Sequence, residues 1–126
     1  MDLELIFKRF PTQEDCINFL EILKWNGNPQ CPYCKSTKPT PLPKELRYHC
    51  NNCRSSFSVT TRTLFHKTKI ELQRWFLAIP LVINKKISAR QLGNIINVTK
   101  DTACSMISRI KIEHIANPEF INHFVN

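Results

Sequence analysis

Apolar residues recur at helical spacing in the first part of the chain. The repeat consists of Cys16, Phe19, Leu20 and Leu23. A stripe with this period predicts an amphipathic helix. Thr12 is a suitable N-cap residue before it, and Gly27 is a suitable stop after it. The helix carries several acidic residues, and we expect it to pack on the rest of the fold without binding a ligand.

A second repeat predicts a helix over residues 71–84. Its inward-facing positions are Leu72, Trp75, Phe76, Ile79 and Ile83. Pro80 lies within this span, and an interior proline removes one backbone hydrogen bond. The pattern therefore predicts either a bend or a break at Pro80.

Two shorter helices follow within ISARQLGNIINVTKDTACSMISRIKIEHI. Ser88 is a suitable N-cap for a helix ending near Ile96, and Thr99 for a helix running to about Ala116. Asn97 between them takes a left-handed turn conformation at low cost. Gly93 is small enough for the two helices to cross closely. This pattern is typical of a helix-turn-helix.

Strand-like alternation lies between these helical segments. LRYHC and SSFSVTT place β-branched and aromatic residues near period 2, and Leu64 and Phe65 complete the predicted strand region. The preceding stretch holds four prolines, which favours loops. We expect a small set of antiparallel strands.

Four cysteines flank the strand-like stretch in the pattern C-x2-C-x15-C-x2-C. They are Cys31, Cys34, Cys50 and Cys53. Two residues between paired cysteines allow a tight turn to aim both sulfurs at one point, and two such turns make a tetrahedral thiolate cage. The spacing predicts a structural Zn2+ site, with iron in the same four-sulfur set as the alternative. Cys16 and Cys104 are expected to be buried or half-buried thiols and not ligands.

The chain has 126 residues and a net charge of +8, and the charge is unevenly distributed. Residues 1–27 carry −2, residues 28–54 carry +4, residues 62–116 carry +7 and the last ten carry −1. A basic surface favours nucleic acid as a partner; the alternative is a solvated basic face that only aids solubility. We see no signal peptide and no apolar run of membrane-spanning length, and expect a cytoplasmic, nucleoid-associated protein with reduced thiols.

If the helix pair binds duplex DNA, its second helix lies in the major groove. Asp101 would be repelled by phosphate unless it accepts from a cytosine amino group. Arg90 and Lys111 flank the helix and are candidates for phosphate contacts. The candidates on the second helix and its cap are Thr99, Lys100, Asp101, Thr102, Ser105 and Arg109.

The order of these parts resembles the N-terminal region of bacterial insertion-sequence transposases of the zinc-ribbon type. The motifs that carry the resemblance are CPYC…CNNC, FSVTTRT, the KI-x-L-x-RWF stretch and ISARQLGNIINVTKDTA. The resemblance implies that this region recognises element DNA. In such proteins a separate RNase-H-like domain with metal-binding carboxylates then cuts and joins strands.

We expect no enzymatic activity from this chain itself. It ends at Asn126, where the transposases enter their catalytic domain. A two-metal nuclease needs several converging carboxylates. The acidic residues after the ribbon are Glu71, Asp101, Glu113 and Glu119. A catalytic transposase subunit acting in trans is a candidate partner, whereas a membrane or a small-molecule substrate is not expected.

The predicted fold class is α+β, with a small antiparallel zinc ribbon between an N-terminal helix and a C-terminal helix-turn-helix bundle. The predicted domains are an N-terminal helix over 1–27, the zinc ribbon over 28–66 and the helix-turn-helix domain over 67–126. Two alternatives to DNA binding stay open. One is a protein-interaction adaptor or transcription regulator that docks a partner through the ribbon. The other is RNA binding through Tyr33, Tyr48 and Phe57.

Overall fold

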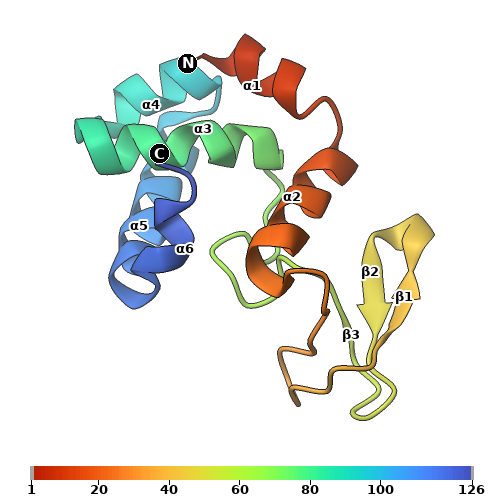
Figure 1. The fold of residues 1–126 in the computed structure, drawn as a ribbon. Coiled ribbons are helices and arrows are strands. Elements are labelled where there is room, and N and C mark those ends of the chain that lie inside the picture. The colour runs from red at the N-terminus through yellow and green to blue at the C-terminus, as the bar shows by residue number, and fades with distance from the viewer. Residues whose placement is uncertain (1, 126) are drawn as a thin grey trace. The chain divides into compact units, whose positions relative to one another are not determined.

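The structure, a computed structural model, describes residues 2–125 and consists of two compact units (Figure 1). We call residues 14–68 the ribbon unit, and residues 2–13 with 69–125 the helical unit. The ribbon unit contains a three-stranded antiparallel sheet and the cysteine cluster. The helical unit is made of helices. The α+β class predicted from the sequence is confirmed.

The sheet of the ribbon unit is small and has the strand order β1-β2-β3. Tyr48 on the central strand pairs with Phe57 on its neighbour, and Thr40 pairs with His49 on the other side. The elements of this unit are α2 (Gln13–Trp25, whose first residue belongs to the helical unit), β1 (Thr40–Leu42), η1 (Pro43–Glu45), β2 (Arg47–His49) and β3 (Ser56–Phe57). The short 3-10 helix η1 closes the β1–β2 hairpin at the end away from Cys50.

Helix α2 packs against the sheet through aromatic rings. The ring of Trp25 meets the rings of Tyr48 and Phe57 edge-on, with centroids 5.4 and 5.9 Å apart. The Tyr48 hydroxyl donates to Glu21 Oε1 at 3.0 Å. Phe57 is fully buried. Because each strand of the sheet is only two to three residues long, these rings supply much of the apolar core of the unit.

The strand region predicted to continue to Phe65 is wrong beyond Phe57. The chain instead makes successive turns, with backbone N–H groups of Thr61, Thr63, His66 and Thr68 each donating to the carbonyl three residues earlier. Threonine hydroxyls supply the competing bonds. Thr61 Oγ1 accepts from the Ser58 N–H at 3.0 Å, and Thr63 Oγ1 donates to the Thr60 carbonyl at 2.7 Å. Such local side-chain bonds compete with strand pairing.

The helical unit is built around α3, which contacts α1, α4 and α5. The sequence predicted a bend or a break at Pro80; helix α3 runs without interruption through Pro80, so a break is excluded. Its predicted inward positions are buried except Ile83, which is half-buried. The helices of this unit are α1 (Leu3–Arg9), α3 (Leu72–Lys85), α4 (Ala89–Ile96), α5 (Lys100–Ala116) and α6 (Pro118–Asn122).

Helices α1 and α6 have no counterpart in the sequence prediction. They are seven and five residues long, too short for a periodic apolar stripe. Asp2 caps α1 by accepting from the Leu5 N–H at 3.0 Å. Tertiary contacts hold both helices: Phe10 packs edge-on against Phe76 of α3, and Phe124, after α6, packs on the same ring. Over residues 2–125, every helix falls short of the length and apolar character that crossing a membrane requires.

Candidate metal centre and nucleic-acid interface

Two turns with the same backbone geometry present the four cysteines. We call residues 31–36 the first knuckle and residues 50–55 the second knuckle. In the first, the Cys31 N–H donates to the Ser36 carbonyl at 3.0 Å and the Lys35 N–H to the Cys31 carbonyl at 2.9 Å. In the second, the Cys50 N–H donates to the Ser55 carbonyl and the Arg54 N–H donates to the Cys50 carbonyl, each at 2.8 Å. The repeated C-x-x-C-[K/R]-S sequence therefore folds into the same turn twice.

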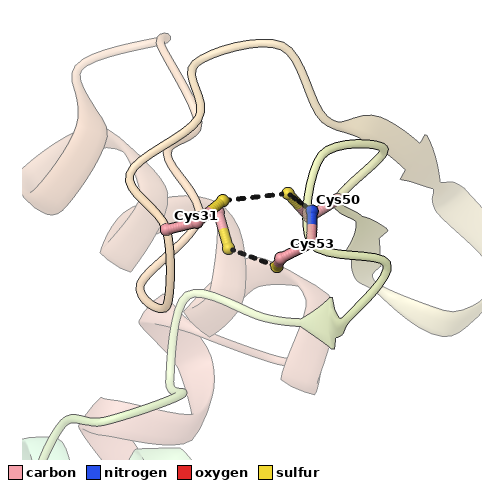
Figure 2. Close-up of side chains that lie close together, drawn as sticks. Cys31, Cys50 and Cys53 are labelled. Atoms are coloured by element: carbon pink, nitrogen blue, oxygen red, sulfur yellow. Dashed lines mark hydrogen bonds between the residues drawn. The ribbon is translucent and has the colours of Figure 1, made fainter.

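The two knuckles face one another through their sulfurs, as Figure 2 shows for Cys31, Cys50 and Cys53. Cys31 Sγ lies 3.6 Å from Cys53 Sγ, and Cys34 Sγ lies 3.4 Å from Cys50 Sγ. All four sulfurs lie within 4.8 Å of one another. Zn–S bonds of about 2.3 Å in a tetrahedron separate the sulfurs by about 3.8 Å. The cluster has the size of a four-thiolate metal site, and its separations are well beyond a disulfide bond of about 2.05 Å.

The sulfurs differ in burial and in acidity. Cys31 and Cys50 are buried, Cys34 is half-buried and Cys53 is exposed. Burial raises the pKa of the Cys31 thiol to about 11. The Asn52 side-chain amide, which donates to Cys34 Sγ at 3.5 Å, lowers the pKa of Cys34 to about 6. Hydrogen bonding to Ser55 lowers the pKa of Cys53. Cys34 and Cys53 therefore form thiolates readily, whereas Cys31 favours ionisation only beside a cation.

Backbone N–H groups also point at the sulfurs. The Tyr33 N–H donates to Cys31 Sγ at 3.4 Å, and the Cys53 N–H donates to Cys50 Sγ at 3.5 Å. Such bonds stabilise thiolate charge. The donor set and its surroundings therefore fit a divalent metal ion with four sulfur ligands.

The two remaining cysteines lie outside the cluster. Cys16 is fully buried in α2, and burial raises its pKa to about 12. Cys104 is exposed on α5, so the expectation that it is buried or half-buried is wrong. Ala103 faces the interior of the helical unit. Cys104 is the next residue along the helix, about 100° further around it, and therefore faces solvent.

Helices α4 and α5 are joined by a three-residue turn, residues 97–99. Ser88 forms a capping box with Gln91, and Thr99 Oγ1 accepts from the Thr102 N–H at 3.2 Å. Asn97 has a left-handed backbone with φ 58°. The caps, the turn and both helix ends agree with those predicted from the sequence. Ala103, Met106 and Ile110 form the buried side of α5.

The predicted DNA contacts lie on the solvent side of this helix pair. Thr102 is half-buried, and its hydroxyl accepts from Thr99 Oγ1 at 3.0 Å, so both threonines also serve the cap. Lys111 lies farther along α5 and lines a shallow pocket with Lys86 and His114. The exposed candidates are Arg90, Thr99, Lys100, Asp101, Ser105, Arg109 and Lys111.

The aromatic residues considered for RNA stacking are not presented together. Phe57 is fully buried, and Tyr48 is half-buried with its hydroxyl bonded to Glu21. Tyr33 is 43% exposed. Stacking on a single strand needs accessible ring faces, so the structure does not support this alternative.

Two facing Cys-x-x-Cys knuckles beside a small antiparallel sheet are the arrangement of a small metal-binding ribbon. Comparison with known proteins narrows this class. Residues 11–56 match the family described as "Transposase zinc-ribbon domain". The resemblance predicted from the motifs is confirmed for this segment.

One curated relative extends the similarity beyond the ribbon. The chain is 29% identical over 105 residues to an uncharacterised protein in transposable element ISH50 of Halobacterium salinarum. That alignment covers 81% of this chain and 36% of the relative, so the chain spans about a third of the relative's length. No solved structure matches the chain. The similarity is to a protein of an insertion element, in agreement with the sequence motifs.

Proposed function

We propose that this chain is the DNA-binding module of a transposase-like protein, with no catalytic activity of its own. Helix α5 would enter the major groove and the ribbon would be held by a structural metal ion. The observation that carries the proposal is the polar, solvent-exposed N-terminal half of α5, presented by the short turn that follows α4. Similarity to a transposable-element protein supports the same function.

The chemistry of α5 fits base and phosphate recognition. Recognition helices use the residues near their N-terminus to contact base edges. Lys100 and Ser105 are exposed there and offer an ammonium and a hydroxyl. Asp101 would accept from a cytosine amino group. Arg90, Arg109 and Lys111 would contact phosphates, which supply most of the affinity and make it salt-dependent.

The metal proposal rests on the cage of Cys31, Cys34, Cys50 and Cys53. When bound, Zn2+ would link the two knuckles through four thiolates without an open coordination position, which is the arrangement of a structural site. The same donor set would accept iron, and elemental analysis of the purified protein distinguishes the two. A catalytic subunit acting in trans and a cytoplasmic, nucleoid-associated location follow from the proposed function.

Selection from a random duplex pool, followed by a gel-shift titration, tests the proposal. Enrichment of a motif is the expected result. Arg90→Gln and Lys111→Gln should weaken binding to all duplexes alike, whereas Lys100→Ala and Asp101→Ala should change the preference among sequences, by about 1–3 kcal/mol at a base. Lys8→Gln on α1 is the matched charge control. Absence of any shift at low salt would contradict DNA binding.

A protein-interaction adaptor is the second candidate function, favoured by one observation. Ile112 and Ile115, on the C-terminal half of α5, are 67% and 84% exposed. Large apolar side chains in adjacent turns of one helix face are a feature of protein-binding surfaces. An adaptor would give no duplex shift and would bind its partner with little dependence on salt.

A further inference from the structure

Positively charged residues occupy an unusual share of the left-handed backbone positions. Eight non-glycine residues within 2–125 have positive φ, and five of these are Lys or Arg. Lys and Arg together make up 18 of the 126 residues, one in seven. The left-handed conformation is cheapest for Gly and tolerable for Asn, and it is costly for long side chains. The five are Lys35, Arg54, Arg62, Lys67 and Lys86.

Two of these cations occupy the same position in the two knuckles. Lys35 follows Cys34 and Arg54 follows Cys53, with φ of 64° and 61°. The left-handed turn is required at this position, because the N–H of each residue returns to the carbonyl of the first cysteine of its knuckle. Gly would satisfy the turn without strain, yet an exposed cation stands there both times. Backbone geometry alone does not account for this choice.

A third left-handed cation is held against the first knuckle. Arg62 Nη1 donates to the Pro32 carbonyl at 3.2 Å. Its guanidinium carbon lies 4.6 Å from the centroid of the Tyr33 ring. The Arg62 N–H donates to His66 Nδ1 at 2.7 Å, which fixes the turn that carries it. The guanidinium thus uses one N–H and one of its two planar faces for contacts within the protein. These contacts fix its orientation while the residue stays exposed to solvent.

We propose that Lys35, Arg54 and Arg62 form a phosphate-binding surface, the knuckle surface, through which the ribbon unit contacts the DNA backbone. This inference rests on the proposed function and adds to it a second contact on a different unit of the chain. A metal ion bound by the four sulfurs would hold the two knuckles together. The hydrogen bond to the Pro32 carbonyl and the cation–π contact with Tyr33 hold Arg62 to the first knuckle. A preorganised guanidinium loses less conformational entropy when it binds phosphate. The metal site would then act indirectly, by positioning these cations.

Charge compensation is the competing explanation for the same cations. Four thiolates around a divalent ion leave a formal charge of −2, and nearby cations would offset it. In that case, removal of Lys35 or Arg54 would weaken metal retention. If the cations bind phosphate, their removal would weaken DNA binding and reduce its salt dependence while the metal is kept.

Glycine substitution separates these explanations. Lys35→Gly and Arg54→Gly remove the charge and suit the left-handed turn, so the knuckles keep their fold. Binding to a labelled duplex of mixed sequence would be measured across a salt series. We expect each single variant to lower the slope of log affinity against log salt by about 1. The triple variant, which combines both glycine substitutions with Arg62→Gln, should lower it by about 3. Lys35→Arg and Arg54→Lys keep the positive charge, so each should have the same slope as the unchanged protein.

Lys44→Gln is the matched control, because Lys44 is an exposed cation of the same unit at the far end of the β1–β2 hairpin. Its slope should equal that of the unchanged protein. Zinc retention against a chelator should be the same for all variants. An unchanged slope in the glycine variants, with Arg90→Gln still weakening binding, would overturn the knuckle surface and leave the proposed function standing. Loss of zinc in the glycine variants would overturn it in favour of charge compensation, and failure of the unchanged protein to bind duplex would overturn both proposals.

Discussion

The backbone oxygen of Val98 lies 2.8 Å from the point where a β-carbon on Gly93 would stand. The same turn is closed by the Val98 N–H, which donates to the Gly93 carbonyl at 3.0 Å. Real β-carbons do not approach a backbone oxygen this closely, so the turn between α4 and α5 requires a residue without a side chain at position 93. The proposed recognition helix is positioned by this contact.

Gly93→Ala should therefore destabilise the helical unit. Alanine normally stabilises a helix interior by about 1 kcal/mol relative to glycine. Here the clash with a backbone atom should reverse the sign and cost about 1–3 kcal/mol. Urea unfolding monitored by circular dichroism measures the change. Stabilisation by the substitution would contradict the close contact, because it would show that helix propensity alone governs this position.

Removal of Cys50, one of the four proposed metal ligands, should unfold the ribbon unit. The sheet is too small to form an extensive core, and structural zinc contributes on the order of 10 kcal/mol of binding free energy in small zinc domains. Cys50→Ser, or treatment with a chelator, should abolish metal binding and the near-ultraviolet signal from Trp25 and its neighbouring rings. Cys104→Ser is the control that should retain both. Metal-free protein with an unchanged aromatic signal would contradict a structural site.

Arg74 links three helices of the helical unit. Its guanidinium donates to Glu71 Oε1 at 2.9 Å and to the carbonyl of Ile96 at the end of α4, and it lies 5.7 Å from the centroid of the Phe7 ring. Arg74→Met keeps the apolar stem and leaves the Ile96 carbonyl without this donor. We expect a loss of about 1–3 kcal/mol in thermal or urea unfolding.

Glu71→Gln is the matched control for this prediction, since it weakens only the ion pair between Arg74 and the exposed Glu71 side chain. Its effect should stay below about 1 kcal/mol, as for other surface ion pairs. Equal effects of the two substitutions would show that the contact with Ile96 contributes little.

Tyr48 should make the stability of the ribbon unit depend on alkaline pH. Burial and the bond to Glu21 raise the pKa of Tyr48 from its usual value of 10 to about 12. Below pH 10 the hydroxyl is neutral in both the folded and the unfolded state, and its stabilising contribution is complete. Between pH 10 and about 12 the unfolded state ionises first, so the contribution falls as pH rises.

Tyr48→Phe tests this dependence. At neutral pH it should cost about 1 kcal/mol through loss of the bond to Glu21. The difference in unfolding free energy between the two proteins should shrink as the pH rises from 10 to 12. Tyr33→Phe, at an exposed ring, is the control for loss of a tyrosine hydroxyl at neutral pH. A difference that stays constant over this range would contradict the raised pKa.

Local spacing along the chain was sufficient to locate the cluster of four cysteines and the α4–α5 pair. The two Cys-x-x-Cys turns are short, and their geometry depends on neighbouring residues. The same holds for the caps Ser88 and Thr99 and for the left-handed turn at Asn97, where side chains bond to backbone groups three residues away. The predicted helix ends therefore agree with the structure to within a residue or two.

Tertiary contacts decided the features that spacing could not show. The segment after Phe57 has strand-like composition, but threonine hydroxyls close turns there, and alternation does not reveal such bonds. Helix α1 is short and is held by packing against α3, which lies more than sixty residues away in the chain. Arg62 reaches Pro32 and Tyr33 across thirty residues. Propensity and periodicity report on nearby residues only, whereas burial and long-range hydrogen bonds depend on which distant segments the fold brings together.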